Sequence, residues 1–279
     1  MRTLRHHLIL YDAECPMCKV YTRAFTKSGM LEPNGRAPYQ AVLDSGNRQL
    51  HATCPRIDRQ RAVNEIALID TATGEVSYGI ESMFKVIGHS FPLFRPLFNC
   101  HAFVWIMRKA YAFVSYNRKI IIPPSPAIAL AKAGPASLTA GLTVASIPQP
   151  TFNLKYRLAY VVFTTLIVTA ILTRYSHLLT TVQPPAGRWP ILLIGCGVIF
   201  YNGLVAGFLT PIKRWDYLGN TMTVALAGAL ALLPVLGLAA ITRLPPTAAA
   251  IWLMLVTALM LPEQVRRTKL LINKSATAF

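Results

Sequence analysis

Two cysteines separated by two residues, Cys15 and Cys18, are the residues whose types and spacing point to chemistry. They follow an apolar run, Leu8 to Tyr11, and an acidic turn that begins at Asp12. Pro16 suits the first position of a helix, because its missing N–H costs no hydrogen bond there and its φ is already helical. A strand that delivers such a pair to the start of a helix is typical of proteins that exchange thiols and disulfides.

The positions of the two thiols predict different roles. Cys15 falls where unsatisfied backbone N–H groups and the positive end of the helix dipole favour the thiolate, which is the attacking species. Cys18 lies one turn further on; we expect it to be more buried and to resolve a mixed disulfide at Cys15. Asp12 could accept a proton from the resolving thiol, or it could cap the turn or the helix. The predicted catalytic residues are therefore Cys15, Cys18 and Asp12.

A metal site is the main competing interpretation of the two cysteines. Zinc needs four ligands, and His51 and Cys54 are the nearest residues in the sequence that could complete a set with Cys15 and Cys18. Our expectation is a site without metal or cofactor. The alternative function is a non-enzymatic domain that binds a protein partner or a metal.

The elements that position the dithiol are predicted from the hydrophobic periodicity. They are a strand at 7–11, a helix from Pro16 to about Gly29, a strand at Tyr39 to Leu43, a hairpin of Glu65 to Asp70 with Glu75 to Tyr78, a helix from Gly79 to Ile87 and an aromatic-rich helical stretch from Phe94 to Lys119. This order predicts a sheet covered by helices. The aromatic stretch is either a packing helix of the domain or a helix on a membrane surface, given Arg108, Lys109, Arg118 and Lys119.

The two halves of the chain differ in composition. The net charge is +17, yet from residue 123 onward the chain is strongly apolar and has only two acids, Asp216 and Glu263. This contrast predicts a soluble domain at 1–121, a Pro-rich linker at 122–153 and a membrane domain at 154–279. The basic residues lie between apolar runs or among acids, without an aromatic platform, so the bilayer and not nucleic acid is the expected partner.

Four apolar segments predict four transmembrane helices: Leu158 to Thr173, Trp189 to Leu209, Met222 to Thr242 and, short for a span, Ala248 to Leu261. Lys and Arg residues flank them in a pattern that places both termini in the cytosol, as in an integral protein of the bacterial inner membrane. No ionisable residue lies deep in a predicted span, which argues against a transporter. The spacing of Gly203 and Gly207 predicts close helix packing and leaves a homo-oligomer through the membrane helices open.

The motif of Tyr11-Asp12, Cys15-Pro16 and Cys18 resembles the DCC thiol-disulfide oxidoreductase family. The resemblance covers about residues 6–120 and includes Glu65 to Asp70, Gly74, Gly79 and Tyr116-Asn117-Arg118. It implies an α/β thioredoxin-like N-terminal domain, here followed by an all-α four-helix transmembrane domain. It also implies activity on a protein thiol or disulfide substrate, with Asp12, Cys15 and Cys18 as the functional residues.

The sequence departs from the family pattern at two places. Ala13 stands where the family commonly has glycine, which suits a less strained turn. Ala62-Val63-Asn64 precede the third strand, where thioredoxin-like enzymes have a proline that helps to dock the substrate. The membrane half lies outside the resemblance.

Overall fold

The computed structural model describes residues 1–43, 57–123, 151–182, 202–242 and 244–276. The chain divides into two compact units, Met1–Asn153 and Leu154–Phe279. Each unit is described by itself.

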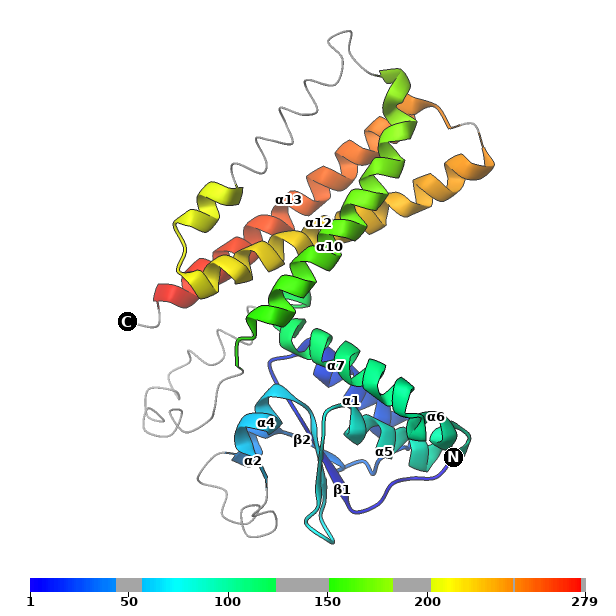
Figure 1. Ribbon diagram of the computed structural model, residues 1–279, viewed down its shortest axis with the longest axis vertical. Helices are drawn as coiled ribbons and strands as arrows, with labels where there is room; N and C mark the ends of the chain where they lie inside the picture. The colour runs from blue at the N-terminus through cyan, green and yellow to red at the C-terminus, as the bar shows by residue number, and fades with distance from the viewer. Residues whose placement is uncertain (44–56, 124–150, 183–201, 243, 277–279) are drawn as a thin grey trace. The chain divides into compact units, whose positions relative to one another are not determined.

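The N-terminal unit is built on a four-stranded mixed sheet (Figure 1). Its strands are β1 (His7–Tyr11), β2 (Arg36–Pro38), β3 (Ala67–Asp70) and β4 (Val76–Tyr78), in the order β2-β1-β3-β4. β1 pairs in parallel with β2 and antiparallel with β3, and β3 forms an antiparallel hairpin with β4. The strand that leads to the dithiol is therefore held on both sides.

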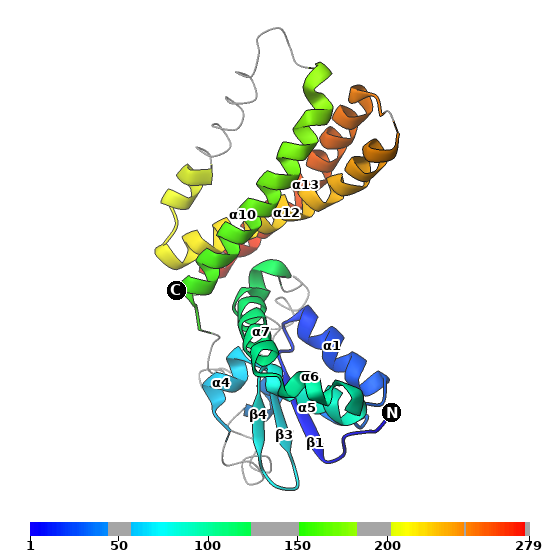
Figure 2. The ribbon, with the colours of Figure 1, turned by 45° about the vertical axis from the view of Figure 1, so that its right-hand side comes forward.

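Helices cover both faces of this sheet (Figures 1 and 2). On one face lie α1 (Pro16–Lys27), α5 (Ile80–Ser90), α6 (Arg95–Asn99) and α7 (His101–Ile121), with a short 3-10 turn, η1 (Pro92–Phe94), before α6. On the other face lie α2 (Tyr39–Leu43) and α4 (Arg59–Asn64). The arrangement is a three-layer α/β unit.

The alternation of side chains along β1 produces the two cores. Ile9 is fully buried and belongs to the cluster that includes Phe25 of α1 and Val86 of α5. Leu10, also fully buried, points to the opposite face and packs with Val63 of α4. Because successive residues of a strand point to opposite faces, this single apolar strand joins both helical layers to the sheet.

The sequence correctly predicts β1, α1 and the β3–β4 hairpin, but it misassigns the second strand. Residues Tyr39–Leu43 form helix α2, and the strand is the preceding segment, Arg36–Pro38. Helix α5 also continues through Gly88 and ends at Ser90 instead of at Ile87. The structure establishes a small mixed sheet in a largely helical chain; the thioredoxin-like identity stays a prediction.

The end of the N-terminal unit makes a contact with α4. The backbone N–H of Thr151 donates a hydrogen bond to Oδ1 of Asn64, at 2.8 Å. The predicted linker lies largely outside the described residues, but this contact fixes a point just before its end.

The C-terminal unit contains three helices that are long and apolar enough to cross a membrane. They are α10 (Leu154–Ser176), α12 (Pro211–Ile241) and α13 (Pro246–Ala276), and a 3-10 segment, η3 (His177–Val182), follows α10. The predicted span at Ala248 to Leu261 lies inside the last of these helices, whose candidate membrane-crossing stretch is longer, Pro246–Leu271. The predicted span at Trp189 to Leu209 lies largely outside the described residues, and the orientation in the membrane stays a prediction.

Side-chain contacts give the directions of these helices. Tyr160 Oη lies 2.8 Å from Thr223 Oγ1, which brings the first parts of α10 and α12 together. Tyr175, near the end of α10, donates to the carbonyl of Ala249, near the start of α13, at 2.8 Å. Gln264, late in α13, reaches Thr221, early in α12. Helices α10 and α12 therefore run in the same direction, and α13 runs against them.

Candidate functional site

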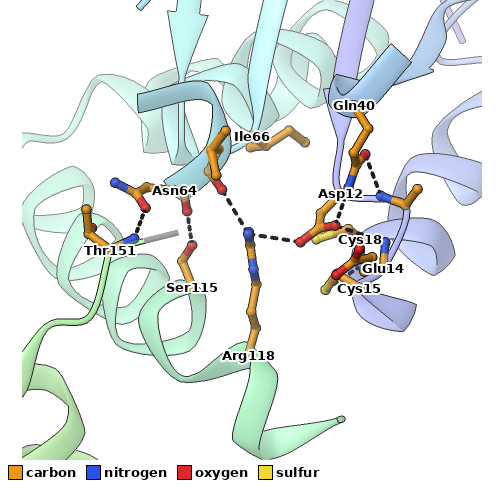
Figure 3. A network of polar contacts seen from close by, with 12 residues as sticks. Asp12, Glu14, Cys15, Cys18, Gln40, Asn64, Ile66, Ser115, Arg118 and Thr151 are labelled. Atoms are coloured by element: carbon orange, nitrogen blue, oxygen red, sulfur yellow. Dashed lines mark hydrogen bonds and ion pairs between the residues drawn. The ribbon is translucent and has the colours of Figure 1, made fainter. Parts of the chain in front are cut away.

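The turn after β1 is organised by the carboxylate of Asp12 (Figure 3). Its Oδ1 accepts hydrogen bonds from the Glu14 backbone N–H and from Gln40 Nε2, both at 2.9 Å. The Ala13 backbone N–H donates to Oε1 of the same Gln40, at 3.2 Å. Asp12 is buried and takes the contacts of a turn residue, as Asp does where its side chain bonds the backbone two residues on.

The dithiol lies at the start of helix α1. Cys15 is the N-cap residue, Pro16 occupies the first helical position, and the Cys15 Sγ accepts a hydrogen bond from the Cys18 backbone N–H at 3.4 Å. No disulfide joins the two cysteines in the structure. Each is 6% exposed, so both thiols are buried, and the expectation that Cys18 is the more buried of the two stays a prediction.

The residue that sequence reasoning missed at this site is Arg118. The sequence left the aromatic helix open between packing in the domain and lying on a membrane surface, and it gave Arg118 no role at the dithiol. The Arg118 side chain is only 8% exposed. Its Nη2 donates to Asp12 Oδ2 at 3.1 Å and to the carbonyl of Val63 at 2.8 Å. A buried cation therefore joins the dithiol turn to the segment before β3.

Helix α7 positions Arg118 through a polar stripe on one of its faces. Tyr111 Oη accepts a hydrogen bond from the Ile66 backbone N–H at 2.9 Å. Ser115 Oγ donates to the Asn64 carbonyl at 2.6 Å (Figure 3). With Arg118, these residues have the i, i+4, i+7 spacing of one helix face. That spacing was the sequence signal for a buried arginine, because polar residues repeat there within an aromatic helix.

The electrostatics of the pair favour one shared negative charge. The pKa of Cys18 is lowered to about 7, first by a hydrogen bond from the Cys15 thiol and then by the positive charge of Arg118 and a hydrogen bond from Tyr21. The pKa of Cys15 is raised, because its thiol donates to Cys18, it is buried, and a second negative charge would stand beside the first. The pair thus loses its first proton easily and its second with difficulty.

This arrangement gives a pH prediction. In the reduced protein, alkylation of the pair by iodoacetamide is expected to rise with a midpoint near pH 7, instead of near the ordinary thiol value of 9.0, because the thiolate is the reacting form. Labelling resolved by mass spectrometry of the peptide with both cysteines measures it. Tyr21→Phe, which removes one donor to Cys18, is expected to raise the midpoint. A wild-type midpoint close to 9.0 would contradict this account.

Among the described residues, no three His, Cys, Asp or Glu side chains are grouped so that they could hold a metal ion. His51 and Cys54, the candidates for completing a zinc site, lie outside those residues. The described side chains that act on Cys18 besides Cys15 are Arg118, Tyr21 and Asp12.

No family model matches the chain, and neither a curated protein nor a solved structure matches it.

Proposed function

We propose that the N-terminal unit is a thiol–disulfide oxidoreductase and that the apolar helices of the C-terminal unit anchor it in a membrane. One observation carries the proposal: a dithiol at a helix start lies beside a buried arginine that favours its thiolate. A buried cation that interacts with both thiols is an arrangement expected where thiolate reactivity is used.

In the proposed reaction, the shared charge moves to Cys15 when its proton passes to Cys18, and the Cys15 thiolate attacks a protein disulfide. A Cys15–substrate disulfide forms and the substrate's S–S bond breaks, which releases one substrate thiolate. That thiolate, or solvent, takes the proton from Cys18, and Cys18 then attacks Cys15. The products are a Cys15–Cys18 disulfide and a substrate with both thiols reduced, so two electrons pass to the substrate. A second dithiol restores the enzyme, and the reverse sequence oxidises a substrate.

Asp12 and Arg118 have supporting roles in this proposal. Arg118 offsets the negative charge of the pair, and Asp12 holds Arg118 and the turn in place through its three hydrogen bonds. Because the Asp12 carboxylate is already occupied by these donors, we assign it positioning of the turn and not proton transfer. Each thiol is 6% exposed, so the reaction includes an opening of the turn that admits the substrate.

The test is reversible formation of the Cys15–Cys18 disulfide in the purified full chain. In glutathione buffers of increasing oxidising strength, the two thiols are expected to become protected from alkylation together, and dithiothreitol should restore both. Cys100→Ser is the matched control, because Cys100 is exposed on another part of the unit and its loss should leave the transition unchanged. A pair that stays reduced while the chain retains zinc would favour the alternative, a metal-binding or partner-binding domain.

The cytosolic side of a bacterial inner membrane is the location we propose for the dithiol, on the basis of the Lys and Arg residues that flank the apolar segments. Thiols are kept reduced in that compartment, which suits a dithiol that acts as a reductant.

A further inference from the structure

Large apolar side chains are exposed over η1, α6 and the first half of α7. The most exposed are Leu93 at 87%, Trp105 at 61% and Ile106 at 56%, and Phe91, Phe94 and Leu97 are also exposed. We call these six residues the apolar surface. Single exposed apolar residues are common, but here six large ones lie within sixteen positions of one chain segment, and exposed apolar side chains that gather in this way mark interaction sites.

The apolar surface is held rigidly from beneath. Phe98 of α6 stacks on Phe84 of α5 with 4.4 Å between ring centroids, and Phe103 of α7 stacks on Phe84 at 5.9 Å. Phe94 also contacts Phe98. These rings fasten α6 and α7 to α5, so the exposed residues project from a packed scaffold and are not the unpacked side chains of a loop.

The charges around the apolar surface are positive. Arg95, Arg108 and Lys109 are exposed in the same segment, and Arg108 pairs with Glu81. After Glu81 the sequence contains no Asp or Glu until Asp216. Apolar and aromatic side chains on a segment whose own charges are all positive are complementary to the boundary between anionic headgroups and acyl chains.

We propose that the apolar surface docks the N-terminal unit on the anionic leaflet of the bilayer that its own chain spans. Trp105, Leu93 and Ile106 enter the headgroup boundary, and Arg95 and Lys109 contact lipid phosphates. Apolar helices in the same chain keep a bilayer within reach, so even a weak surface affinity is sufficient. This inference is independent of the dithiol chemistry, which uses residues at the other end of α7.

The test uses the full chain in lipid nanodiscs, where reagents reach both leaflets. Trp189→Phe, Trp215→Phe and Trp252→Phe leave Trp105 as the only tryptophan. Its emission is expected to shift to the blue and to be quenched by lipids brominated at shallow acyl positions. Both effects should be larger with phosphatidylglycerol added than in phosphatidylcholine alone. The control chain adds Trp105→Phe and Val20→Trp, because Val20 is 70% exposed on α1; its emission should stay red-shifted and unquenched.

A second readout uses the wild-type chain. Cys100 lies between α6 and α7 beside the apolar surface and is exposed. Its modification by a water-soluble maleimide is expected to slow in nanodiscs with phosphatidylglycerol. Emission of Trp105 that matches the Val20→Trp control, or quenching that is equal in the two lipid compositions, would overturn the proposal. A blue shift without lipid quenching, together with Cys100 cross-links between chains, would also overturn it and identify a second copy as the occupant.

Discussion

Replacement of Arg118 by methionine is expected to destabilise the N-terminal unit by about 3–5 kcal/mol, the usual cost of breaking a buried ion pair by removing one partner. The Asp12 carboxylate, 5% exposed, would lose the cation that lies 3.1 Å away. The Val63 carbonyl would lose its bond from Arg118 at the same time. Hydrogen exchange of the β1 and β3 amides in the full chain measures this loss, because these strands form the centre of the sheet.

The double variant Asp12→Asn with Arg118→Met distinguishes stability lost through the broken ion pair from stability lost through the packing of the arginine side chain. The asparagine Oδ1 can still accept from Glu14 and Gln40, and no buried charge remains, so this variant should be more stable than Arg118→Met alone. If the double variant is as unstable as the single one, the loss comes from packing of the arginine side chain and not from an unpaired carboxylate.

The same variants should also differ in the pH midpoint at which the thiols are alkylated. The positive charge of Arg118 lowers the pKa of Cys18 and the negative charge of Asp12 raises it. Arg118→Met should therefore shift the alkylation midpoint upward, and the added Asp12→Asn should bring it part of the way back. Arg118→Lys keeps the positive charge but loses the forked geometry of the guanidinium group. It should therefore leave the alkylation midpoint nearly unchanged while it destabilises the N-terminal unit.

The Cys18→Ser variant is expected to accumulate a covalent complex with its substrate, whereas Cys15→Ser should form none. With Cys15 as the attacking thiol, a mixed disulfide forms normally but cannot be resolved once Cys18 is absent. Turnover should be abolished in both variants, which makes this the largest expected effect on activity. Non-reducing electrophoresis followed by mass spectrometry of the released partner measures the complex and identifies the substrate.

This experiment can also show that the attacking and resolving roles of the two thiols are exchanged, because the shared charge is more stable on Cys18 than on Cys15. A complex that accumulates in Cys15→Ser and not in Cys18→Ser would make Cys18 the nucleophile. Cys100→Ser, combined with either variant, excludes a complex formed through the exposed thiol.

Local sequence was sufficient to predict the part of the site that is formed by contiguous residues. The apolar run of β1, the Asp12 turn and the Cys15-Pro16 start of α1 depend on strand pattern, turn chemistry and helix capping, all of which act within a few residues. These elements are present as predicted. The hairpin of β3 and β4 was predictable for the same reason.

Features that depend on distant partners could not be predicted in this way. Strand β2 has three residues and is defined by its pairing with β1, so its own sequence, which ends at Pro38, carries little strand signal. Arg118 is 106 positions from Asp12 and next to Lys119, so the sequence could not decide between a packed and a surface position for it. The burial of Arg118 decides for the packed position, and a charge inside a protein requires a partner.

The hydrogen bond from Thr151 to Asn64 limits the distance over which the proposed oxidoreductase can search for substrates. Only Phe152 and Asn153 separate this anchored residue from the first residue of α10. Fully extended, these three peptide steps span roughly 10 Å. While this bond is formed, the proposed oxidoreductase searches for substrates mainly by lateral diffusion in the membrane plane and not through the volume of the cytosol.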